Sequence, residues 1–167
     1  MHLLFNSLLI FATLSTTMIA GLVFTFSAVI MPGIGTLDDR EFVRAFQAID
    51  GIIQNGQPLF GLVWVGSIFS LFAVSILGFL QLDGFPKWLL LAANLLYIAG
   101  VQVPTFKVNL PHNDALQAIS VAHSDEATVA AARNHFEMTW NRANHLRTVV
   151  ATIVSLILIL IVRLGAS

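Results

Sequence analysis

The sequence has no cysteine and few charged residues. Without cysteine, the chain has no disulfide bonds, no thiolate metal ligands and no cysteine nucleophile. Charged residues make up 10% of its 167 residues, against about 25% in an ordinary soluble domain, and 57% are hydrophobic. A soluble domain of this size cannot bury so much apolar surface, and a disordered chain needs the opposite composition. The composition therefore excludes both classes and predicts an integral membrane protein.

The charges are also balanced, because eight Lys and Arg residues oppose nine Asp and Glu residues. This balance gives no basic patch, so we expect no nucleic-acid partner. The sequence has no glycine-rich phosphate loop either. No two of the five histidines stand three or four residues apart, so a metal site would need His112, His145 and a carboxylate brought together by the tertiary fold. We predict no metal and no organic cofactor.

Long hydrophobic runs are what the sequence has in quantity. Four apolar stretches cover residues of about 3–31, 59–80, 86–103 and 146–162. As helices, they are long enough to cross about 30 Å of hydrocarbon. We predict an all-α fold, an integral membrane four-helix bundle formed by residues 1–167 as a single domain. Such a multi-pass protein has the lipid bilayer as its first partner.

The connections between these stretches carry further predictions. Apolar residues recur at helical spacing in residues 41–53, which indicates a short amphipathic helix in the first loop. Ser124 followed by Asp125 and Glu126 is typical of a helix start, with the Ser124 hydroxyl as the cap. No glycine or proline follows until Gly165, so the fourth helix is expected to run from about 125 to 163 and to extend out of the bilayer. Pro104 and Pro111 predict a non-helical connection after the third stretch.

Polar residues gather at one end of the predicted bundle, where the first and third loops lie. The first and third loops also hold six of the eight Lys and Arg residues, so the positive-inside rule predicts that these loops are cytoplasmic. The gathered amide, imidazole, indole and guanidinium groups belong to Asn55, Gln57, Asn109, His112, Asn113, Trp140, Asn141, Asn144, His145 and Arg147. Chemistry, if the protein performs any, is expected at this end.

Two motifs at this end carry a resemblance: Asn109-Leu-Pro111-x-Asn113-x-x-Leu116 and Trp140-Asn141-x-x-Asn144-x-x-Arg147-Thr148. Together with Met31-Pro32 and Gln57-Pro58-x-Phe60, they resemble the anthrone oxygenase-like family of small four-span membrane proteins. The resemblance covers nearly the whole chain. Most members are known only as a domain of unknown function, and some oxidise an anthrone to an anthraquinone with O2. The resemblance thus implies a lipophilic aromatic substrate and O2 as co-substrate.

For that reaction, a base must remove a proton from the substrate, and the resulting enolate can react with O2 without a metal. His145 is the first candidate for the base and His112 the second, since a histidine pKa near 6.5 suits the transfer. Arg147 is the candidate that neutralises the anionic oxygen. The structural alternatives stay open: both histidines as hydrogen-bonded interface residues, and Arg147 in a salt bridge or reaching the interface.

Candidate substrate-binding residues are the polar and aromatic groups around these three, namely Gln57, Asn109, Asn113, Trp140, Asn141 and Asn144. The asparagines can orient hydroxyl and carbonyl groups of a substrate, and Trp140 can stack on a flat ring. Equally, the asparagines can cap helix ends and Trp140 can belong to an interfacial aromatic belt.

Two functions of another class remain. One is a non-catalytic scaffold that binds a partner through the extended fourth helix, and the other is a small transporter. Against transport, the centres of the spans contain no Asp, Glu, Lys or Arg. The sequence is also compatible with a homo-oligomer.

Overall fold

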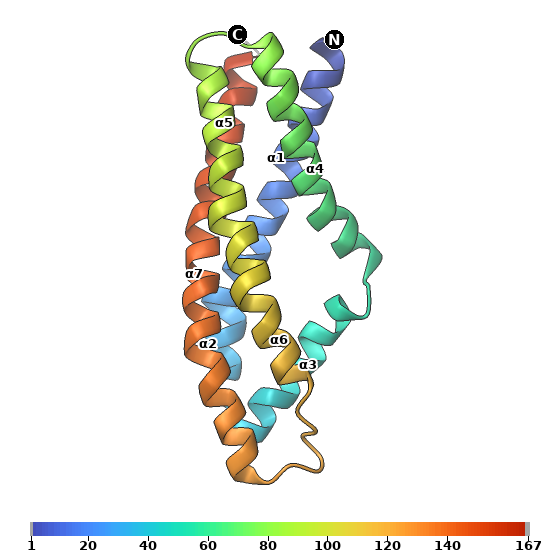
Figure 1. Ribbon diagram of the computed structural model, residues 1–167, viewed down its shortest axis with the longest axis vertical. Helices are drawn as coiled ribbons and strands as arrows, with labels where there is room; N and C mark the ends of the chain where they lie inside the picture. The colour runs from blue at the N-terminus through green and yellow to red at the C-terminus, as the bar shows by residue number, and fades with distance from the viewer. Residues whose placement is uncertain (1, 166–167) are drawn as a thin grey trace.

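The computed structural model describes residues 2–165, and within them every regular element is helical (Figure 1). The predicted all-α fold is confirmed. In chain order the elements are α1 (His2–Thr25), η1 (Phe26–Ile30), α2 (Met31–Ile34), α3 (Asp39–Gln54), α4 (Pro58–Gln81), α5 (Phe85–Tyr97), η2 (Ile98–Gln102), η3 (Thr105–Asn109), α6 (Leu110–Gln117) and α7 (Glu126–Gly165). The three η segments are π-helical turns inside longer helices.

Four helical stretches are long and apolar enough to cross a membrane: Leu3–Ile34, Pro58–Gln81, Phe85–Gln117 and Glu126–Leu164. They run along the long axis of the molecule (Figure 1). The two termini and the α4–α5 connection lie at one end, and α3 and the α6–α7 connection lie at the other. The chain is thus a multi-pass membrane protein by length and composition, and its sidedness stays a prediction.

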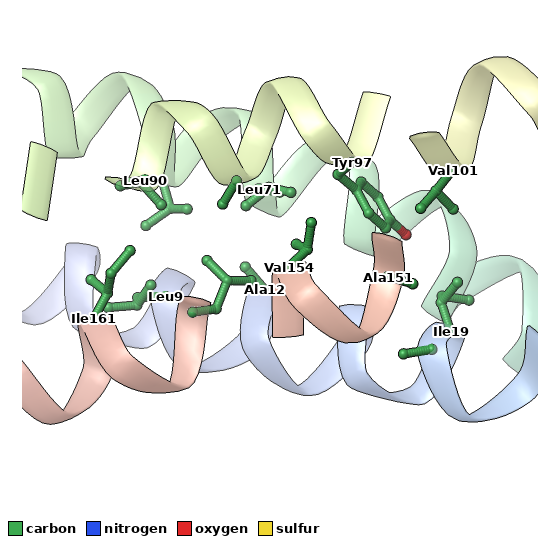
Figure 2. Close-up of a cluster of buried hydrophobic side chains, with 14 of the residues drawn as sticks. Leu9, Ala12, Ile19, Leu71, Leu90, Tyr97, Val101, Ala151, Val154 and Ile161 are labelled. Carbon is green, nitrogen blue, oxygen red and sulfur yellow. The ribbon is translucent and has the colours of Figure 1, made fainter. Parts of the chain in front are cut away.

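The core near the termini is built from α1, α4, α5, η2 and α7. Alanines such as Ala12 and Ala151 are fully buried and let the helix backbones approach closely. Figure 2 labels the central members of this core: Leu9, Ala12, Ile19, Leu71, Leu90, Tyr97, Val101, Ala151, Val154 and Ile161. Large apolar side chains also cover the outside of these helices, as expected for surfaces that face lipid, among them Leu14, Phe69, Leu95 and Leu156.

The expected non-helical connection after the third span is wrong, because the helix continues through both prolines to Gln117. Proline lacks an N–H donor and its ring collides with the carbonyl four residues earlier. In this chain a π-helical segment precedes each proline. The N–H of Val103 donates to the carbonyl of Ile98, and that of Leu110 donates to Thr105, five residues back in each case. This wider spacing accommodates Pro104 and Pro111 without ending the helix.

The amphipathic helix expected in the first loop is confirmed as α3. Asp38 caps it by accepting a hydrogen bond from the N–H of Glu41 at 2.9 Å. Its apolar face packs against the first half of α7, where Phe46 and Phe136 meet edge to face with ring centroids 4.5 Å apart. This forms a second core at the loop end, separate from the one near the termini.

The long fourth helix is also confirmed, as the 40 residues of α7. Its cap is Asp125 rather than Ser124, since the N–H of Thr128 donates to the Asp125 carboxylate at 2.7 Å. Hydrogen bonds from Thr128 hold the pKa of Asp125 below its ordinary value. Arg133 then ties the first half of α7 to α3 through an ion pair with Asp39, and to the α2–α3 connection through hydrogen bonds to the carbonyls of Leu37 and Gly35. Its second ion pair, with Glu137, lies within α7.

Candidate functional site

A cavity of about 370 Å³ lies toward the loop end, between α1, η1, α3, α4, η3, α6 and α7. Its walls are mostly apolar or aromatic, with a few polar side chains placed among them. The lining residues are Leu22, Val23, Phe26, Phe46, Asp50, Ile53, Gln54, Phe60, Trp64, Val65, Thr105, Phe106, Asn109, Leu110, Asn113, Trp140 and Arg147. A mostly apolar cavity of this size with few convergent polar groups is typical of a small-molecule site.

Asp50 is a carboxylate on the α3 wall, with 3% of its surface exposed. The amides of Asn113, Gln117 and Gln54 donate hydrogen bonds to it at 2.8, 3.1 and 3.0 Å. Within residues 2–165, no Lys, Arg or His makes an ion pair with Asp50. Buried carboxylates are uncommon, and this one is held by neutral donors and borders a cavity.

Trp140 connects this carboxylate to the aromatic wall. Its indole N–H donates to Oδ1 of Asn113 at 2.6 Å, and Asn113 in turn donates to Asp50. The rings of Phe26 and Phe46 lie 5.6 Å from that of Trp140, centroid to centroid. Neighbouring aromatic rings in these tilted and edge-on arrangements form a rigid wall.

Arg147 provides the second charged group. Its guanidinium donates to Oγ1 of Thr105 at 3.0 Å and to Oδ1 of Asn144 at 2.6 Å, and 6% of the residue is exposed. It also lies over the Trp140 ring, 5.7 Å from the centroid. In the part of the chain that the structure describes, no carboxylate lies within ion-pair distance of Arg147.

Asn144 holds Arg147 in place without lining the cavity itself. Its amide donates to the carbonyl of Val23 at 2.9 Å and to Oγ of Ser27 at 2.8 Å. Both acceptors belong to the first helical stretch, so Asn144 joins α7 to it. This leaves Oδ1 of Asn144 free to accept from Arg147, which fixes the guanidinium at the cavity.

The structure brings together only some of the residues named from the sequence. Four of them line the cavity: Asn109, Asn113, Trp140 and Arg147. Asn141 is half-buried and contributes its carbonyl to His145. Gln57 caps α4 by accepting a hydrogen bond from the N–H of Phe60 at 2.6 Å.

Neither histidine lines the cavity. His145 is exposed, and its Nδ1 lies 2.8 Å from the carbonyl of Asn141 in the same helix. His112 is half-buried, with Nδ1 2.8 Å from the carbonyl of Val108 and its ring stacked on His135 at 5.2 Å. The structure therefore places both candidate bases away from the carboxylate and the guanidinium.

Three polar lining residues were not among the site residues predicted from the sequence: Asp50, Gln54 and Thr105. For Asp50, the sequence does contain an indication of burial. It follows Phe46 by four residues and Val43 by seven, which places its charge within the apolar stripe of the predicted amphipathic helix. A charged residue at such a position is a candidate for a buried functional group.

For metal binding, the described residues offer no suitable cluster. Between residues 2 and 165, no three His, Cys, Asp or Glu side chains come together as metal ligands. The two charged groups at the cavity are instead one carboxylate and one guanidinium.

Comparison with known proteins gives one match. A sequence model of the family described as "Anthrone oxygenase" matches residues 51–157. No curated protein and no solved structure matches the chain. The matched range contains the cavity walls from α4, η3, α6 and α7, and Asp50 directly precedes it.

Proposed function

Because the chain belongs to the anthrone oxygenase family, we propose that it oxidises a flat, lipophilic aromatic substrate with O2 in the cavity between α3 and α7. The observation that carries the proposal is the cavity itself: aromatic walls, one buried carboxylate and one buried guanidinium. A flat aromatic molecule fits such walls by stacking, and it reaches them from the membrane in which it dissolves.

In the proposed reaction Asp50 is the base, in place of either histidine. Its carboxylate borders the cavity, whereas the imidazoles of His145 and His112 do not. Asp50 takes a proton from the methylene carbon of an anthrone-type substrate. The electrons of the broken C–H bond delocalise into the ring system and give an enolate. A guanidinium in a site of low dielectric stabilises such a charge strongly.

The remaining steps balance with O2 alone. The enolate gives one electron to O2, and the two radicals join to form a C–O bond and a peroxide anion. The proton held by Asp50 converts this anion to a hydroperoxide. Loss of the second C–H proton and cleavage of the O–O bond then give the ketone and one molecule of water. The substrate is oxidised by four electrons, O2 is reduced by four, and Asp50 ends as it began. No organic cofactor takes part.

The proposal is tested by O2 uptake and anthraquinone formation with emodin anthrone, in membranes that contain the protein and in vector membranes. Ile53→Trp fills the cavity from α3, and Ile52→Trp is the matched control because Ile52 is 63% exposed. We expect uptake above the vector level for the wild type and for Ile52→Trp, and at least a tenfold loss for Ile53→Trp. A wild-type rate equal to that of vector membranes would overturn the proposal and favour a non-catalytic scaffold or a transporter.

A second prediction separates the two candidate bases. His145→Ala is expected to keep the O2-uptake rate within about twofold, because the imidazole is exposed and bonds only to its own helix. The rate is measured in the same membranes and normalised to the amount of protein. If His145→Ala lost a hundredfold or more while remaining folded, His145 and not Asp50 would be the base.

A further inference from the structure

Two of the apolar residues that line the cavity also lie at the surface of the protein. Val65 of α4 is 49% exposed and Phe106 of η3 is 56% exposed, yet both contribute to the cavity wall. A side chain that lines a cavity and has about half of its surface exposed lies at the mouth of that cavity. The cavity therefore opens between α4 and η3.

The contacts of α4 agree with an opening at this place. Among the described residues, α4 packs closely against α1 and α5 but not against η3 or α6. Within residues 2–165, no hydrogen bond or ion pair joins α4 to η3 or α6 either. Figure 1 shows the first turns of α4 diverging from α6 toward the α3–α4 connection. The two sides of the mouth are therefore not held together.

The mouth faces the hydrocarbon of the bilayer. Val65 and Phe106 both lie inside membrane-spanning stretches, the first in α4 and the second in the third span. Beside Val65, the rings of Phe60 and Trp64 stack with their centroids 5.6 Å apart and line the α4 side of the cavity. An apolar, aromatic opening at this depth admits molecules that are dissolved in the membrane, and it excludes ions and strongly polar solutes.

The edge of the cavity at the loop end is closed by polar groups. There the exposed Gln54 lines the cavity, and its amide donates to the carboxylates of Asp50 and Asp114 at 3.0 and 3.1 Å. The amide of Gln117 donates to Asp50 and to the carbonyl of Gln47, at 3.1 Å in both cases. These bonds join α3 to α6, so satisfied polar side chains occupy the route from the water on that side.

From these observations we propose that the cavity has a lateral portal between α4 and η3, through which aromatic molecules dissolved in the bilayer enter and leave. Val65 and Phe106 form the rim of this portal, and the Phe60–Trp64 ring pair forms its α4 side. The inference rests on the cavity of the proposed function, and it adds the route by which that cavity is reached and the residues that control access. It holds for any small, apolar aromatic molecule, whether or not the protein oxidises it.

The test follows entry and not turnover. The reporter is the fluorescence of Trp140, a cavity wall that is 3% exposed, in a Trp64→Phe/Trp88→Phe protein reconstituted into phosphatidylcholine vesicles. The two quenchers are iodobenzene, which dissolves in the bilayer, and iodide, which stays in the water. We expect iodobenzene to quench Trp140 and iodide to leave its fluorescence unchanged.

A removable block assigns the quenching to the portal. The chain has no cysteine, so Val65→Cys in the reporter protein carries a single thiol. Benzyl methanethiosulfonate attaches a ring to this thiol, and dithiothreitol removes it again. We expect the attached ring to lower the quenching constant of iodobenzene at least threefold and dithiothreitol to restore it. Leu62→Cys is the matched control, because Leu62 is 62% exposed on the same helix but does not line the cavity. Its benzylation should leave the quenching unchanged.

Phe106 is tested from the opposite side of the portal. Phe106→Ala removes a ring from the rim and is expected to raise the quenching constant of iodobenzene at least twofold. Phe69→Ala should not, because this ring is 68% exposed on α4 but does not line the cavity. Size-exclusion elution shows whether each variant is folded. An unchanged constant in folded Phe106→Ala would remove Phe106 from the rim.

The outcomes are distinct from those of the proposed function. A Trp140 that iodobenzene does not quench would overturn the inference, and quenching by iodide instead would place the opening on the water side. Quenching that persists unchanged after benzylation of Val65→Cys would overturn it as well. A portal blocked by benzylation, without any O2 uptake on emodin anthrone, would leave the route of entry standing and remove the proposed oxidation. O2 uptake together with quenching that benzylation does not change would do the reverse.

Discussion

Replacing Asp50 by asparagine is expected to lower the rate of anthrone oxidation by about 10²–10⁴-fold, the usual contribution of a positioned base. The amide keeps the size of the side chain but cannot take the proton from the substrate. The measurement is anthraquinone formation per molecule of protein in membranes, with the amount of protein determined separately. Asp114→Asn is the matched control, because Asp114 also accepts from Gln54, at 3.1 Å, but is exposed and does not line the cavity.

A structural role for Asp50 is separated from a role as base by an isotope effect. If Asp50 removes the proton, its loss should make proton removal the rate-limiting step of the reaction. Deuterium in place of the methylene hydrogens of the substrate should then slow the variant. Asp50→Asn should therefore show a larger substrate isotope effect than the wild type. Asp50→Asn with an unchanged rate would eliminate Asp50 as the base. A lower rate caused only by misfolding would appear as altered elution of the purified variant in size-exclusion chromatography.

The helices were largely predictable from the sequence because apolar runs and their spacing determine them directly. Even the 40-residue α7 followed from the absence of helix breakers before Gly165. The continuity of the third span was not predictable, because the usual effect of Pro104 and Pro111 is to end a helix. The π-helical segments η2 and η3 accommodate the two prolines, which lack a backbone N–H donor. No sequence pattern predicts such segments.

The polar end of the molecule was predicted, but the orientation of α7 was not. Helical periodicity puts Asn141, Asn144 and His145 on one side of α7, and their polarity predicts that this side faces the interior. In the structure Asn144 is buried and His145 is exposed. His145 and Thr152 each bond to a carbonyl of their own helix at 2.8 Å, so polar side chains here need no interior partner. Polarity alone therefore does not identify the buried side of a membrane helix.

Asp50 was missed for a related reason. It belongs to a helix outside the apolar stretches, where charged residues are common and one carboxylate does not stand out. Only tertiary packing brings α3 beside α6 and α7, where Asn113 and Trp140 connect Asp50 to the cavity. The sequence does show that the charge of Asp50 falls within the apolar stripe of the predicted amphipathic helix.

The second large effect is expected on stability, from Gly100→Ala. A Cβ on Gly100 would lie 2.7 Å from both methyl carbons of Val150 on α7. Valine is β-branched and has little rotamer freedom in a helix, so the helices themselves must move apart. Overpacking of this kind costs about 1–3 kcal/mol. We expect the midpoint of thermal unfolding in detergent to fall by several degrees, measured by circular dichroism on purified protein.

Two other glycines of the spans are controls for this prediction. A Cβ on Gly21 meets nothing within 4 Å, and alanine favours a helix more than glycine does, so Gly21→Ala should be neutral or stabilising. A Cβ on Gly78 would lie 2.4 Å from Cδ2 of the fully buried Leu90, so Gly78→Ala should also lower stability and is the control for overpacking remote from η3. An equal loss of stability in all three variants would contradict the specific role of the Gly100–Val150 contact.

The same contact links stability to the site. Gly100 belongs to η2, which precedes η3, and η3 positions Thr105 against Arg147 at 3.0 Å. Moving this helix away from α7 shifts Thr105 and weakens the support of the guanidinium. Gly100→Ala should therefore also lower the rate of anthrone oxidation in membranes, whereas Gly78→Ala should preserve it. A destabilised Gly100→Ala with an unchanged oxidation rate would show that η3 holds its position independently of the Gly100 contact.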